Sequence, residues 1–463
     1  METVENILGQ ADSIVWGPFL LIPLLLLTGL YLTVMLRGLQ VRKFGLAFNL
    51  ALIKRKEEGD AEGDVSHYQA LSTALAATVG VGNIAGVATA ITLGGPGAVL
   101  WMWVTGMVGM ATKYSEAFLG VRYRRADAKG EQSGGPMFYL RHGVGGRLGW
   151  FLGGAFAIFG AIAAFGIGNG VQAGEVANAL NAQWSVPVWV SGLVVAILAG
   201  VVILGGVKVI SRVTAGFVPV MIAVYMVGAL IILAINVNEL PAAFATIFTD
   251  AFSGTAAVGG FAGAGVVAAV QYGVGRGIFS NESGLGTAAI IAAAAKTTHP
   301  VRQALVSMTQ TFIDTLIVVS GTALVIVTSG VWRRGEEDGS ALTAAAFNDA
   351  LPGGGVIVTI SVMTFAFSTL LGWGYYGERC MDYLFGRGAV VPYRIIFVIF
   401  IFVATVVSLD VLWTFASVLN GLMALPNLVG LLLLSPLIVR ETKQYFEDQS
   451  GGVQTDPGTP VAR

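Results

Sequence analysis

The chain has little charge and almost no cysteine, and both shortages restrict what it can be. Only 11% of its 463 residues are charged, against about 25% in soluble domains, while 55% are hydrophobic. A soluble fold of this length would have too few charges to cover its surface, so the sequence predicts a polytopic membrane protein. The single cysteine, Cys380, excludes a disulfide framework and a multi-cysteine metal site.

Motifs of common catalytic chemistry are also missing. The three histidines (His67, His142 and His299) stand near loops, without the spacing of zinc ligands. No Ser/His, Cys/His or His/Glu set falls inside the apolar runs, and no G-x-x-x-x-G-K-[ST] phosphate loop is present. We therefore expect no enzyme, no ATP-driven pump, no organic cofactor and no nucleic-acid partner.

Apolar runs long enough to cross a bilayer recur along the chain. A span needs about 20 mostly apolar residues. The N-terminus is acidic and lacks Lys and Arg, so we expect the first run to be a retained span and not a cleaved signal. The eleven runs cover residues 14–36, 69–93, 97–121, 150–180, 186–205, 213–236, 261–292, 300–330, 356–379, 391–409 and 411–439.

Basic residues are segregated between the connections. Six alternate segments, counting the C-terminal tail, carry 22 of the 26 Lys and Arg residues. The intervening connections hold only Arg333 and Arg334, and nearby acidic residues offset these two. Because basic loops stay cytoplasmic, the pattern predicts a multi-pass protein of the prokaryotic inner membrane with its N-terminus outside and its C-terminus inside.

The ten runs after the first divide into two groups of five. Since five is odd, the second group must enter from the opposite side, which gives an inverted repeat. The predicted fold class is an all-α membrane protein with eleven transmembrane helices, one N-terminal helix followed by a 5+5 inverted repeat. The predicted units are the N-terminal helix (1–36), a cytoplasmic connection (37–68), the two repeats (69–236 and 261–440), an outer interfacial segment (237–260) and a disordered cytoplasmic tail (441–463).

The first run of each group contains a glycine-rich break. The breaks read "GVGNIAG" in one group and "QYGVGRGIFSNESGLG" in the other. A broken membrane helix frees carbonyl groups that bind a small cation and amide groups that attract an anion. A zwitterionic amino acid needs both, so the paired breaks favour a binding site at the middle of the membrane. The alternative for each break is close helix packing through small residues.

Four stretches of the chain resemble one known family. The stretch "GGPGAVLWMWVTGMVGM" (94–110) looks like the signature of the alanine-or-glycine:cation symporters, also called sodium/alanine symporters. "TVGVGNIAGVATAI", "GNGVQA" and "GIFSNESGLG" resemble the same family, and the likeness extends over nearly the whole chain. It implies sodium-coupled uptake of alanine or glycine on the ten-helix fold of the bacterial leucine transporter, with one extra N-terminal helix. The alternatives are a proton-coupled symporter, another small neutral amino acid, or a passive channel or receptor.

The resemblance also implies an ion site. The first-helix break of that fold matches the G-V-G-N stretch at 80–83. Carbonyl oxygens and hydroxyl groups beside the break would then bind sodium reversibly. The alternative for the hydroxyls is a hydrogen bond to the carbonyls of their own helix. The implied sodium ligands are Ala76, Val79, Phe365, Ser368 and Thr369.

Substrate contacts are expected from both breaks and from the run at 150–180. Asn169 and Gln172 are three residues apart and therefore on one helix face, where their amides could hold a carboxylate or an ammonium. The alternative for each amide is an interhelical hydrogen bond. Trp373 is expected to close over the substrate methyl group. The candidate substrate ligands are Thr78, Gly80, Gly82, Asn83, Asn169, Gln172, Gln271, Gly273, Gly275 and Trp373.

Several ionisable residues fall inside the runs, where charge is costly and often functional. Lys113 and Glu116 are three residues apart and are expected to pair. Arg276 and Glu282 flank the second break and would either pair as a gate or hold the unwound segment. The carboxylates without an evident partner, either of which could couple transport to protons, are those of Glu175 and Asp314.

Overall fold

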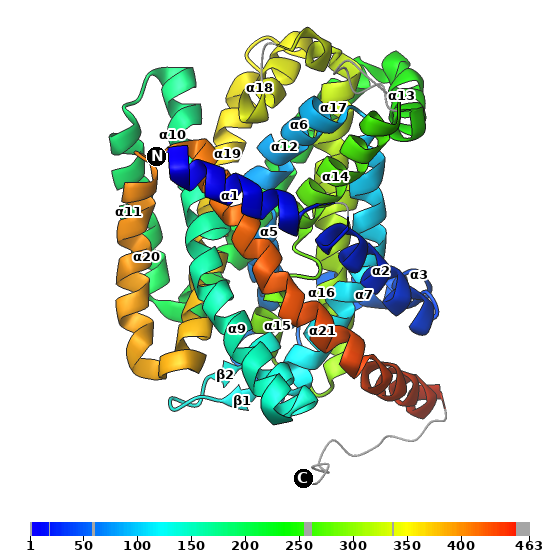
Figure 1. The fold of residues 1–463 in the computed structure, drawn as a ribbon, viewed down its shortest axis with the longest axis vertical. Coiled ribbons are helices and arrows are strands. Elements are labelled where there is room, and N and C mark those ends of the chain that lie inside the picture. The colour runs from blue at the N-terminus through cyan, green and yellow to red at the C-terminus, as the bar shows by residue number, and fades with distance from the viewer. Residues whose placement is uncertain (1, 18, 58–60, 254–261, 336–337, 451–463) are drawn as a thin grey trace.

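The computed structural model describes residues 2–17, 19–57, 61–253, 262–335 and 338–450, and helices dominate it (Figure 1). A short antiparallel hairpin joins β1 (Arg125–Ala126) to β2 (Gln132–Ser133). The helices of the first half are α1 (Glu2–Val15), α2 (Leu21–Met35), α3 (Leu39–Arg42), α4 (Phe44–Phe48), α5 (His67–Thr78), α6 (Ala85–Gly94), α7 (Ala98–Arg122), α8 (Pro136–Tyr139), α9 (Gly146–Phe165), α10 (Val171–Trp184), α11 (Val188–Leu204) and α12 (Gly206–Ile235). The later helices are α13 (Leu240–Ser253), α14 (Ala262–Asn281), α15 (Thr287–Ala293), α16 (Pro300–Thr311), α17 (Ser320–Ser329), α18 (Gly339–Ala350), α19 (Gly355–Phe385), α20 (Val390–Ala404) and α21 (Leu409–Ser450).

Each predicted apolar run coincides with a helix or with two or three consecutive helical segments. The first run begins later than predicted, because α1 ends at Val15 and the apolar helix α2 starts at Leu21. Six helical stretches of the described residues are long and apolar enough to cross a membrane, judged by length and composition. Shorter apolar helices, among them α2, α6 and α11, accompany them. The number of eleven crossings stays a prediction.

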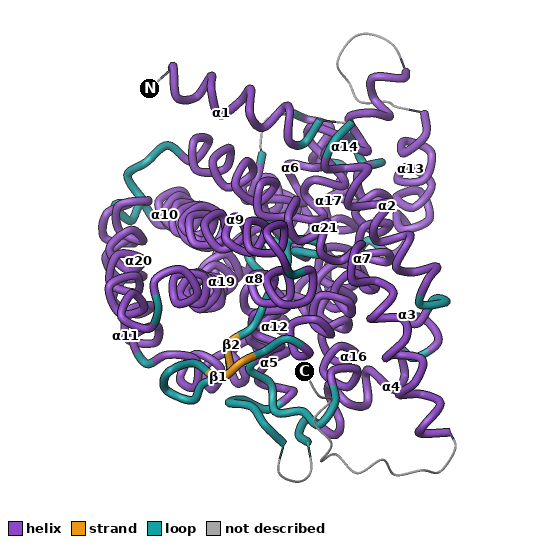
Figure 2. Tube along the Cα trace, turned by 60° about the horizontal axis from the view of Figure 1, so that its bottom comes forward, coloured by secondary structure: helices purple, strands orange, loops and turns teal. Residues whose placement is uncertain are grey.

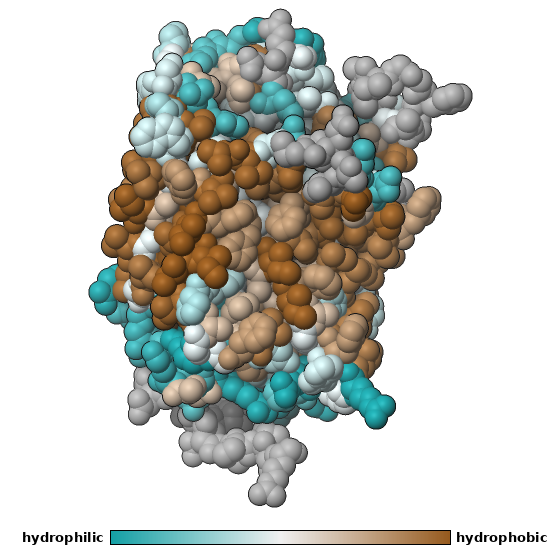
Figure 3. Space-filling model, turned by 60° about the vertical axis from the view of Figure 1, so that its left-hand side comes forward, coloured by the Kyte–Doolittle hydropathy of each residue, from teal (hydrophilic) through white to brown (hydrophobic). Residues whose placement is uncertain are grey.

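The lipid-facing surface is apolar around the middle of the molecule. Figure 3 shows a brown band across one face, with hydrophilic residues gathered above and below it. The adjacent helices α11 and α20 expose Ile197, Val201, Ile396 and Ile399 (Figure 2). Exposing so much apolar surface to water would be unfavourable, so this surface is suited to the hydrocarbon of a bilayer.

The two ends of the molecule are distinguished by what they carry. The β1–β2 hairpin and the end of α21 lie at one end, which we call the hairpin end (Figure 1). The helices α13 and α18 lie at the opposite end, which we call the α18 end (Figure 1). Arg124, Arg125 and Arg387 lie at the hairpin end, in or beside the hairpin.

Two helices in the interior are interrupted. Residues 79–84, between α5 and α6, form what we call the first break, and they include a 3-10 turn at Val81–Asn83. Residues 282–286, between α14 and α15, form the second break. The second break was predicted within residues 271–286, and only residues 282–286 are interrupted, so the prediction is wrong for residues 271–281. The helix α14 continues through this region because Gly273 packs there against α7, where an added Cβ would lie 2.4 Å from the Ala98 carbonyl oxygen.

Two other helices contain π-helical segments, at Gly166–Gly170 between α9 and α10 and at Phe312–Val319 between α16 and α17. A π-helical turn holds more residues than an α-helical turn and therefore shifts the face on which later side chains lie. The prediction that Asn169 and Gln172 share a face is wrong for this reason. Asn169 Nδ2 donates to the Phe397 carbonyl of α20 at 2.8 Å, while Gln172 Oε1 accepts from the Val81 N–H at 3.2 Å.

The connecting segments follow the predictions in part. Helix α13 lies within the predicted interfacial segment 237–260, of which residues 254–261 lie outside the described residues. The connection 37–68 contains the short helices α3 and α4. Helix α21 continues to Ser450, so residues 441–450 are helical and the prediction of a disordered tail is wrong for them. The remaining tail, 451–463, lies outside the described residues.

Candidate functional site

The first break satisfies its backbone with neutral side chains. The Gly80 N–H donates to Asn83 Oδ1 at 2.9 Å, and the Val81 N–H donates to Gln172 Oε1 at 3.2 Å. Gln172 is held in turn by a bond from its Nε2 to the Ile167 carbonyl at 2.8 Å. Buried backbone groups need such partners. Because Gln172 is an uncharged amide, a ligand can replace it at the Val81 N–H without leaving a buried charge unpaired.

Five oxygen atoms meet where the first break packs against α19. Ser368 Oγ lies 3.1 Å from the Ala76 carbonyl, 3.5 Å from the Val79 carbonyl and 2.8 Å from the Phe365 carbonyl. Thr369 Oγ1 lies 3.1 Å from the carbonyl oxygens of Ala76 and Phe365. We call these five residues the oxygen cluster. All five implied sodium ligands therefore come together, and all five are buried.

The oxygen cluster has acceptor capacity without formal charge. In this structure both hydroxyl groups donate to the surrounding carbonyls, including that of Phe365 in their own helix. Each hydroxyl has one hydrogen and two lone pairs. If the hydrogens turn away, hydroxyl and carbonyl oxygens can face one small cation, which is how carbonyls at broken membrane helices coordinate sodium. The role of the cluster as an ion site stays a prediction.

Two glycines let the first break approach its neighbours closely. A Cβ at Gly80 would lie 2.5 Å from Thr369 Oγ1 and 3.1 Å from Gln172 Oε1. A Cβ at Gly82 would lie 3.3 Å from the Phe279 ring in α14. Contacts below 3.0 Å require something to shift, so position 80 in particular needs a residue without a side chain. The break thereby lies beside the oxygen cluster and α14 at the same time.

Asn83 joins the first break to a buried carboxylate. Its Nδ2 donates to Asp314 Oδ1 at 2.8 Å. Ser280 Oγ and Thr315 Oγ1 donate to Asp314 Oδ2 at 3.0 and 2.8 Å. No partner of Asp314 was evident in the sequence, because Asn83 lies 231 residues away and Ser280 lies 34 residues away. Asp314 therefore fixes the first break to α14 and to the π-helical segment at 312–319.

The second break is held by a carboxylate from α7. Glu116 Oε1 accepts from the N–H groups of Gly284 and Gly286 at 3.0 and 2.9 Å, and from Asn427 Nδ2 at 2.8 Å. Gly284 and Gly286 have φ values of +96° and +85°, a region that favours glycine. Their positive φ turns both N–H groups toward one oxygen. A buried anion of the protein itself therefore occupies the position where a ligand anion was expected.

Glu282 and Trp373 hold the same break from the other side. Glu282 has a φ of +58°, which is strained for a residue with a side chain. Its carboxylate accepts from Trp373 Nε1 and from Thr287 Oγ1, both at 2.6 Å. Trp373 also packs closely on Gly168. In this structure the Trp373 indole therefore holds Glu282 at the second break. Its role in closing over the substrate methyl group stays a prediction.

Lys113 and Glu116 do not form the predicted pair. Within the described residues, Lys113 Nζ is buried and has no hydrogen-bond partner, while Glu116 binds the second break. The acidic groups that act electrostatically on Lys113 are Glu116, Glu282 and Asp314. The glycines at 284 and 286 were the sequence signal for a nearby anion, but nothing in the sequence identified Glu116 as that anion.

The other candidate substrate ligands do not meet at the first break. Thr78 ends α5, and its hydroxyl donates to the Ala74 carbonyl of its own helix at 3.1 Å. Gln271, Gly273 and Gly275 lie inside α14 and outside the second break. Gly273 contacts α7, and Gly275 faces the ring of Trp16. Their part in substrate binding is untested, but the structure gives the two glycines a packing role.

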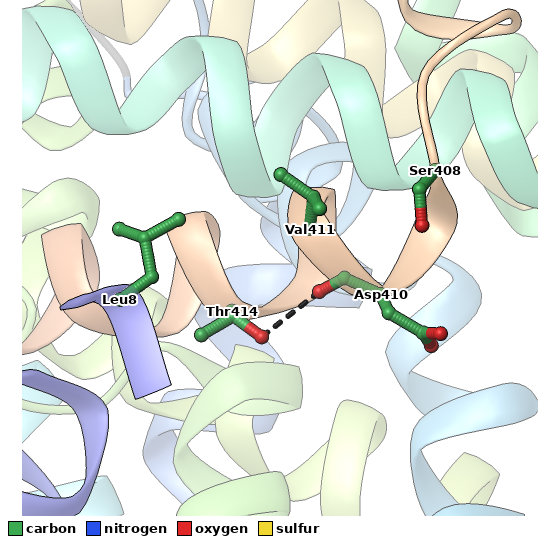
Figure 4. Close-up of a pocket in the computed structure, with 5 residues that line it drawn as sticks. All are labelled: Leu8, Ser408, Asp410, Val411 and Thr414. Atoms are coloured by element: carbon green, nitrogen blue, oxygen red, sulfur yellow. Dashed lines mark hydrogen bonds between the residues drawn. The ribbon is translucent and has the colours of Figure 1, made fainter. Parts of the chain in front are cut away.

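A cavity of about 700 Å³ lies near the α18 end, and we call it the vestibule. Its walls come from α6, α10, α14, α18, α19 and α21. Between the vestibule and the first break stands an aromatic pair, Phe279 and Trp413, whose ring centres are 4.6 Å apart. Figure 4 shows a smaller pocket beside it, where Leu8 of α1 faces the start of α21. The charged residues that line the vestibule are Glu175, Arg276, Asp338 and Asp410.

Ion pairs close the hairpin end. The buried Arg379 side chain contacts Asp127 at 3.0 Å and Glu131 at 2.6 Å, and Arg387 contacts the same two residues at 2.9 and 2.8 Å. Burial raises the pKa of Glu131, but the hydrogen bond and charge of Arg379, followed by Arg387, outweigh burial and hold this pKa below its usual value. The hairpin is therefore tied to the end of α19 by fully charged groups at neutral pH.

Comparisons with known proteins cover the whole chain. The family model described as "Sodium:alanine symporter family" matches residues 1–458. The sodium/alanine symporter AgcS of Methanococcus maripaludis is 51% identical over 446 residues, which are 96% of this chain and 97% of that protein. Two proteins of Bacillus subtilis are also similar over 97% of this chain. They are the probable sodium/glutamine symporter GlnT, 33% identical over 92% of its length, and the putative sodium/proton-dependent alanine carrier protein YrbD, 35% identical over 94% of its length.

Solved structures agree on the fold. MhsT in complex with L-phenylalanine has a TM-score of 0.57 at 14% sequence identity, over 83% of this chain and 99% of MhsT. The manganese transporter of Eremococcus coleocola has a TM-score of 0.51 at 14% identity, over 84% of this chain and 81% of that transporter. At these identities the likeness is evidence for the fold alone, which is that of the leucine transporter.

Proposed function

This chain belongs to the sodium:alanine symporter family, and from that premise we propose that it carries alanine or glycine into the cell together with sodium. The family is one of transporters and not of enzymes. Transport would be secondary and active, so the sodium gradient would supply the free energy for accumulation.

The observation that carries the proposal is the oxygen cluster beside the first break. Three of its five neutral oxygens are carbonyl oxygens within 3.5 Å of the Ser368 or Thr369 hydroxyls, and the break frees two of these carbonyls from α-helical bonding. Neutral ligands bind sodium weakly enough to release it, as transport requires. A cation at the cluster would order the residues around Gly80 and thus prepare the substrate site.

The first break is also our proposed substrate site. Gln172 would release the N–H group of Val81 to the substrate carboxylate, helped by the N-terminal end of α6, while Asn83 stays bound to Asp314 and to the Gly80 N–H. The closeness of Gly80 to Gln172 and Thr369 leaves little room, which favours a small side chain. The names of the relatives include alanine and glutamine, so the choice among small neutral amino acids is part of the test.

We further propose the inverted repeat and the orientation that the sequence predicts. The ion pairs at the hairpin end and the vestibule at the α18 end support a conformation that is open to the outside and closed to the cytoplasm. Basic residues at the hairpin end support its cytoplasmic placement. Alternating access would then open the hairpin end after sodium and amino acid have bound.

Uptake by the full-length protein in liposomes tests the proposal. Labelled alanine should accumulate above its external concentration under an imposed sodium gradient, and not under a proton gradient alone. Accumulation with protons alone would contradict the sodium assignment and would favour Asp314 as the carboxylate that couples transport to protons. Equilibration without accumulation under either gradient would favour a passive channel. Unlabelled glycine, serine and glutamine, added as competitors, would rank the substrates.

A further inference from the structure

The vestibule contains a guanidinium group without an ion-pair partner among the described residues. Arg276 lines the cavity, and its guanidinium carbon lies 4.4 Å from the centre of a Trp413 ring. The acidic groups that act on Arg276, at distances longer than an ion pair, are Asp12, Asp338 and Glu175. Arginine stays charged and presents planar donors that match a carboxylate. The cavity therefore offers a fixed positive group to an incoming molecule.

A carboxylate lies at another side of the same indole. Glu175 Oε1 accepts from Trp413 Nε1 at 3.3 Å, and its Oε2 accepts from Ser340 at 2.9 Å. Arg276 thus lies over the face of the Trp413 ring, while Glu175 lies at its edge. Both residues line the vestibule. The two opposite charges therefore lie on different sides of one indole, and among the described residues no salt bridge joins them.

Opposite charges on different sides of one indole match the two charged groups of a zwitterionic α-amino acid. The amino nitrogen and the carboxylate carbon of such a molecule are separated by two bonds of about 1.5 Å each. Hydrogen bonds of about 2.9 Å extend its reach at each end. A carboxylate can pair with both arms of a guanidinium, and an ammonium needs acceptors such as the oxygens of Glu175. The further acidic residues, Asp338 and Asp410, disfavour simple anions in the same cavity.

We propose that the vestibule is a first binding station for the zwitterionic amino acid, held between Arg276 and Glu175 before it reaches the first break. This inference rests on the proposed function, because it takes an amino acid as the substrate. Trp413 lines the station and packs on Phe279, and an added Cβ at Gly82 would lie 3.3 Å from the Phe279 ring. Charges at the entrance of a site act mainly on the rate of capture. The station therefore speeds association and leaves dissociation from the inner site unchanged.

Rapid-filtration binding of labelled alanine to the full-length protein in nanodiscs, at saturating sodium, tests the inference. Arg276→Gln should lower the association rate about tenfold, the size of an electrostatic effect on capture, with an unchanged dissociation rate. Arg276→Lys keeps the charge and should stay within about threefold of the original rate. The matched control is Arg333→Gln, because Arg333 also lies over a tryptophan ring, at 5.0 Å from Trp332, but is exposed outside the vestibule. It should leave both rates unchanged.

Glu175→Gln provides a second test in case Arg276→Gln folds poorly. It keeps an acceptor oxygen for Ser340 and Trp413 but removes the charge, so association should again slow. The inference is overturned if these variants leave the association rate unchanged or change dissociation instead. It is also overturned if Glu175→Gln weakens sodium binding while alanine association stays the same, because the acidic groups would then serve the cation. Absence of sodium-dependent alanine binding in the unmodified protein would instead overturn the proposed function.

Discussion

Each break interrupts a helix in the interior, yet the N–H groups of the two breaks donate to different kinds of side chain. At the first break, the N–H groups of Gly80 and Val81 donate to the side-chain amides of Asn83 and Gln172. At the second break, the N–H groups of Gly284 and Gly286 donate to the carboxylate of Glu116. The first set of partners is neutral, and the second is a buried anion.

This difference separates a break that can exchange partners from one that cannot. The amide of Gln172 can turn away when a ligand carboxylate arrives, because no buried charge is left behind, whereas Asn83 also donates to the Asp314 carboxylate and stays in place. If Glu116 left its position, its carboxylate would lose its hydrogen-bond donors inside the membrane, and this costs far more free energy than moving a neutral amide. The first break is therefore suited to bind and release ligands, and the second to act as a fixed support around which the other parts move.

Removing the Glu116 carboxylate should have the largest effect. Glu116→Ala leaves the Gly284 and Gly286 N–H groups and Asn427 Nδ2 without their shared acceptor, at about 1–3 kcal/mol for each buried group. We expect strongly reduced yield of folded protein and a lower midpoint of thermal unfolding in detergent. Glu116→Gln, which keeps one acceptor oxygen, should be milder. The exposed Glu239→Ala is the control and should have no effect. Equal stability of Glu116→Ala and the control would remove the contrast between the breaks.

Adding a methyl group to the first break should abolish transport while the protein still folds. In Gly80→Ala, the Cβ would lie 2.5 Å from Thr369 Oγ1. Overpacking of this kind costs about 1–3 kcal/mol. Here the added methyl group would displace Thr369 of the oxygen cluster and Gln172. We expect at least about tenfold lower sodium-driven alanine uptake, measured in liposomes with matched amounts of protein. Unchanged uptake would mean that the first break does not need its close approach to α19.

The features that the sequence predicted well are local ones. Apolar runs become helices because each run is continuous along the chain, and the G-V-G-N stretch becomes a break because its two glycines are only one residue apart. The oxygen cluster required two distant segments to meet, and the family resemblance supplied that pairing. Physical spacing alone would not have brought Ser368 to the carbonyl of Ala76, which is 292 residues away.

The features that the sequence missed depend on distant partners or on small changes of helical phase. The π-helical turn at Gly166–Gly170 turned Asn169 toward α20, although Asn169 and Gln172 fit one face of a regular helix. Packing of Gly273 against α7 kept α14 helical where its glycines suggested a break. The partner of the second break, Glu116, lies 168 residues from Gly284, and no local pattern marks that contact.

Removing one hydroxyl from the oxygen cluster should weaken sodium binding and leave alanine binding nearly unchanged. Thr369→Ala deletes the group that contacts the Ala76 and Phe365 carbonyls. We expect the sodium concentration for half-maximal uptake to rise about tenfold, equivalent to about 1.4 kcal/mol. The alanine KM at saturating sodium should change less than about threefold. Thr364→Ala is the matched control, because within the described part of the chain that hydroxyl bonds only to the carbonyls of Ile360 and Ser361 in its own helix. Equal changes in both constants would place Thr369 at the substrate instead.

The smallest expected effect concerns Gly86, which belongs to the GVGNIAG stretch but, unlike Gly80, does not pack closely against another helix. Gly86 lies in α6, just after the first break, and an added Cβ there would meet no atom within 4 Å. Alanine is a better helix former than glycine, so Gly86→Ala should stabilise the protein by about 0.5–1 kcal/mol and leave uptake unchanged. Thermal unfolding and the liposome assay measure the two quantities. If uptake fell as it does in Gly80→Ala, glycine would be needed throughout the motif for flexibility, and the proposed role of Gly80 in steric fit would be wrong.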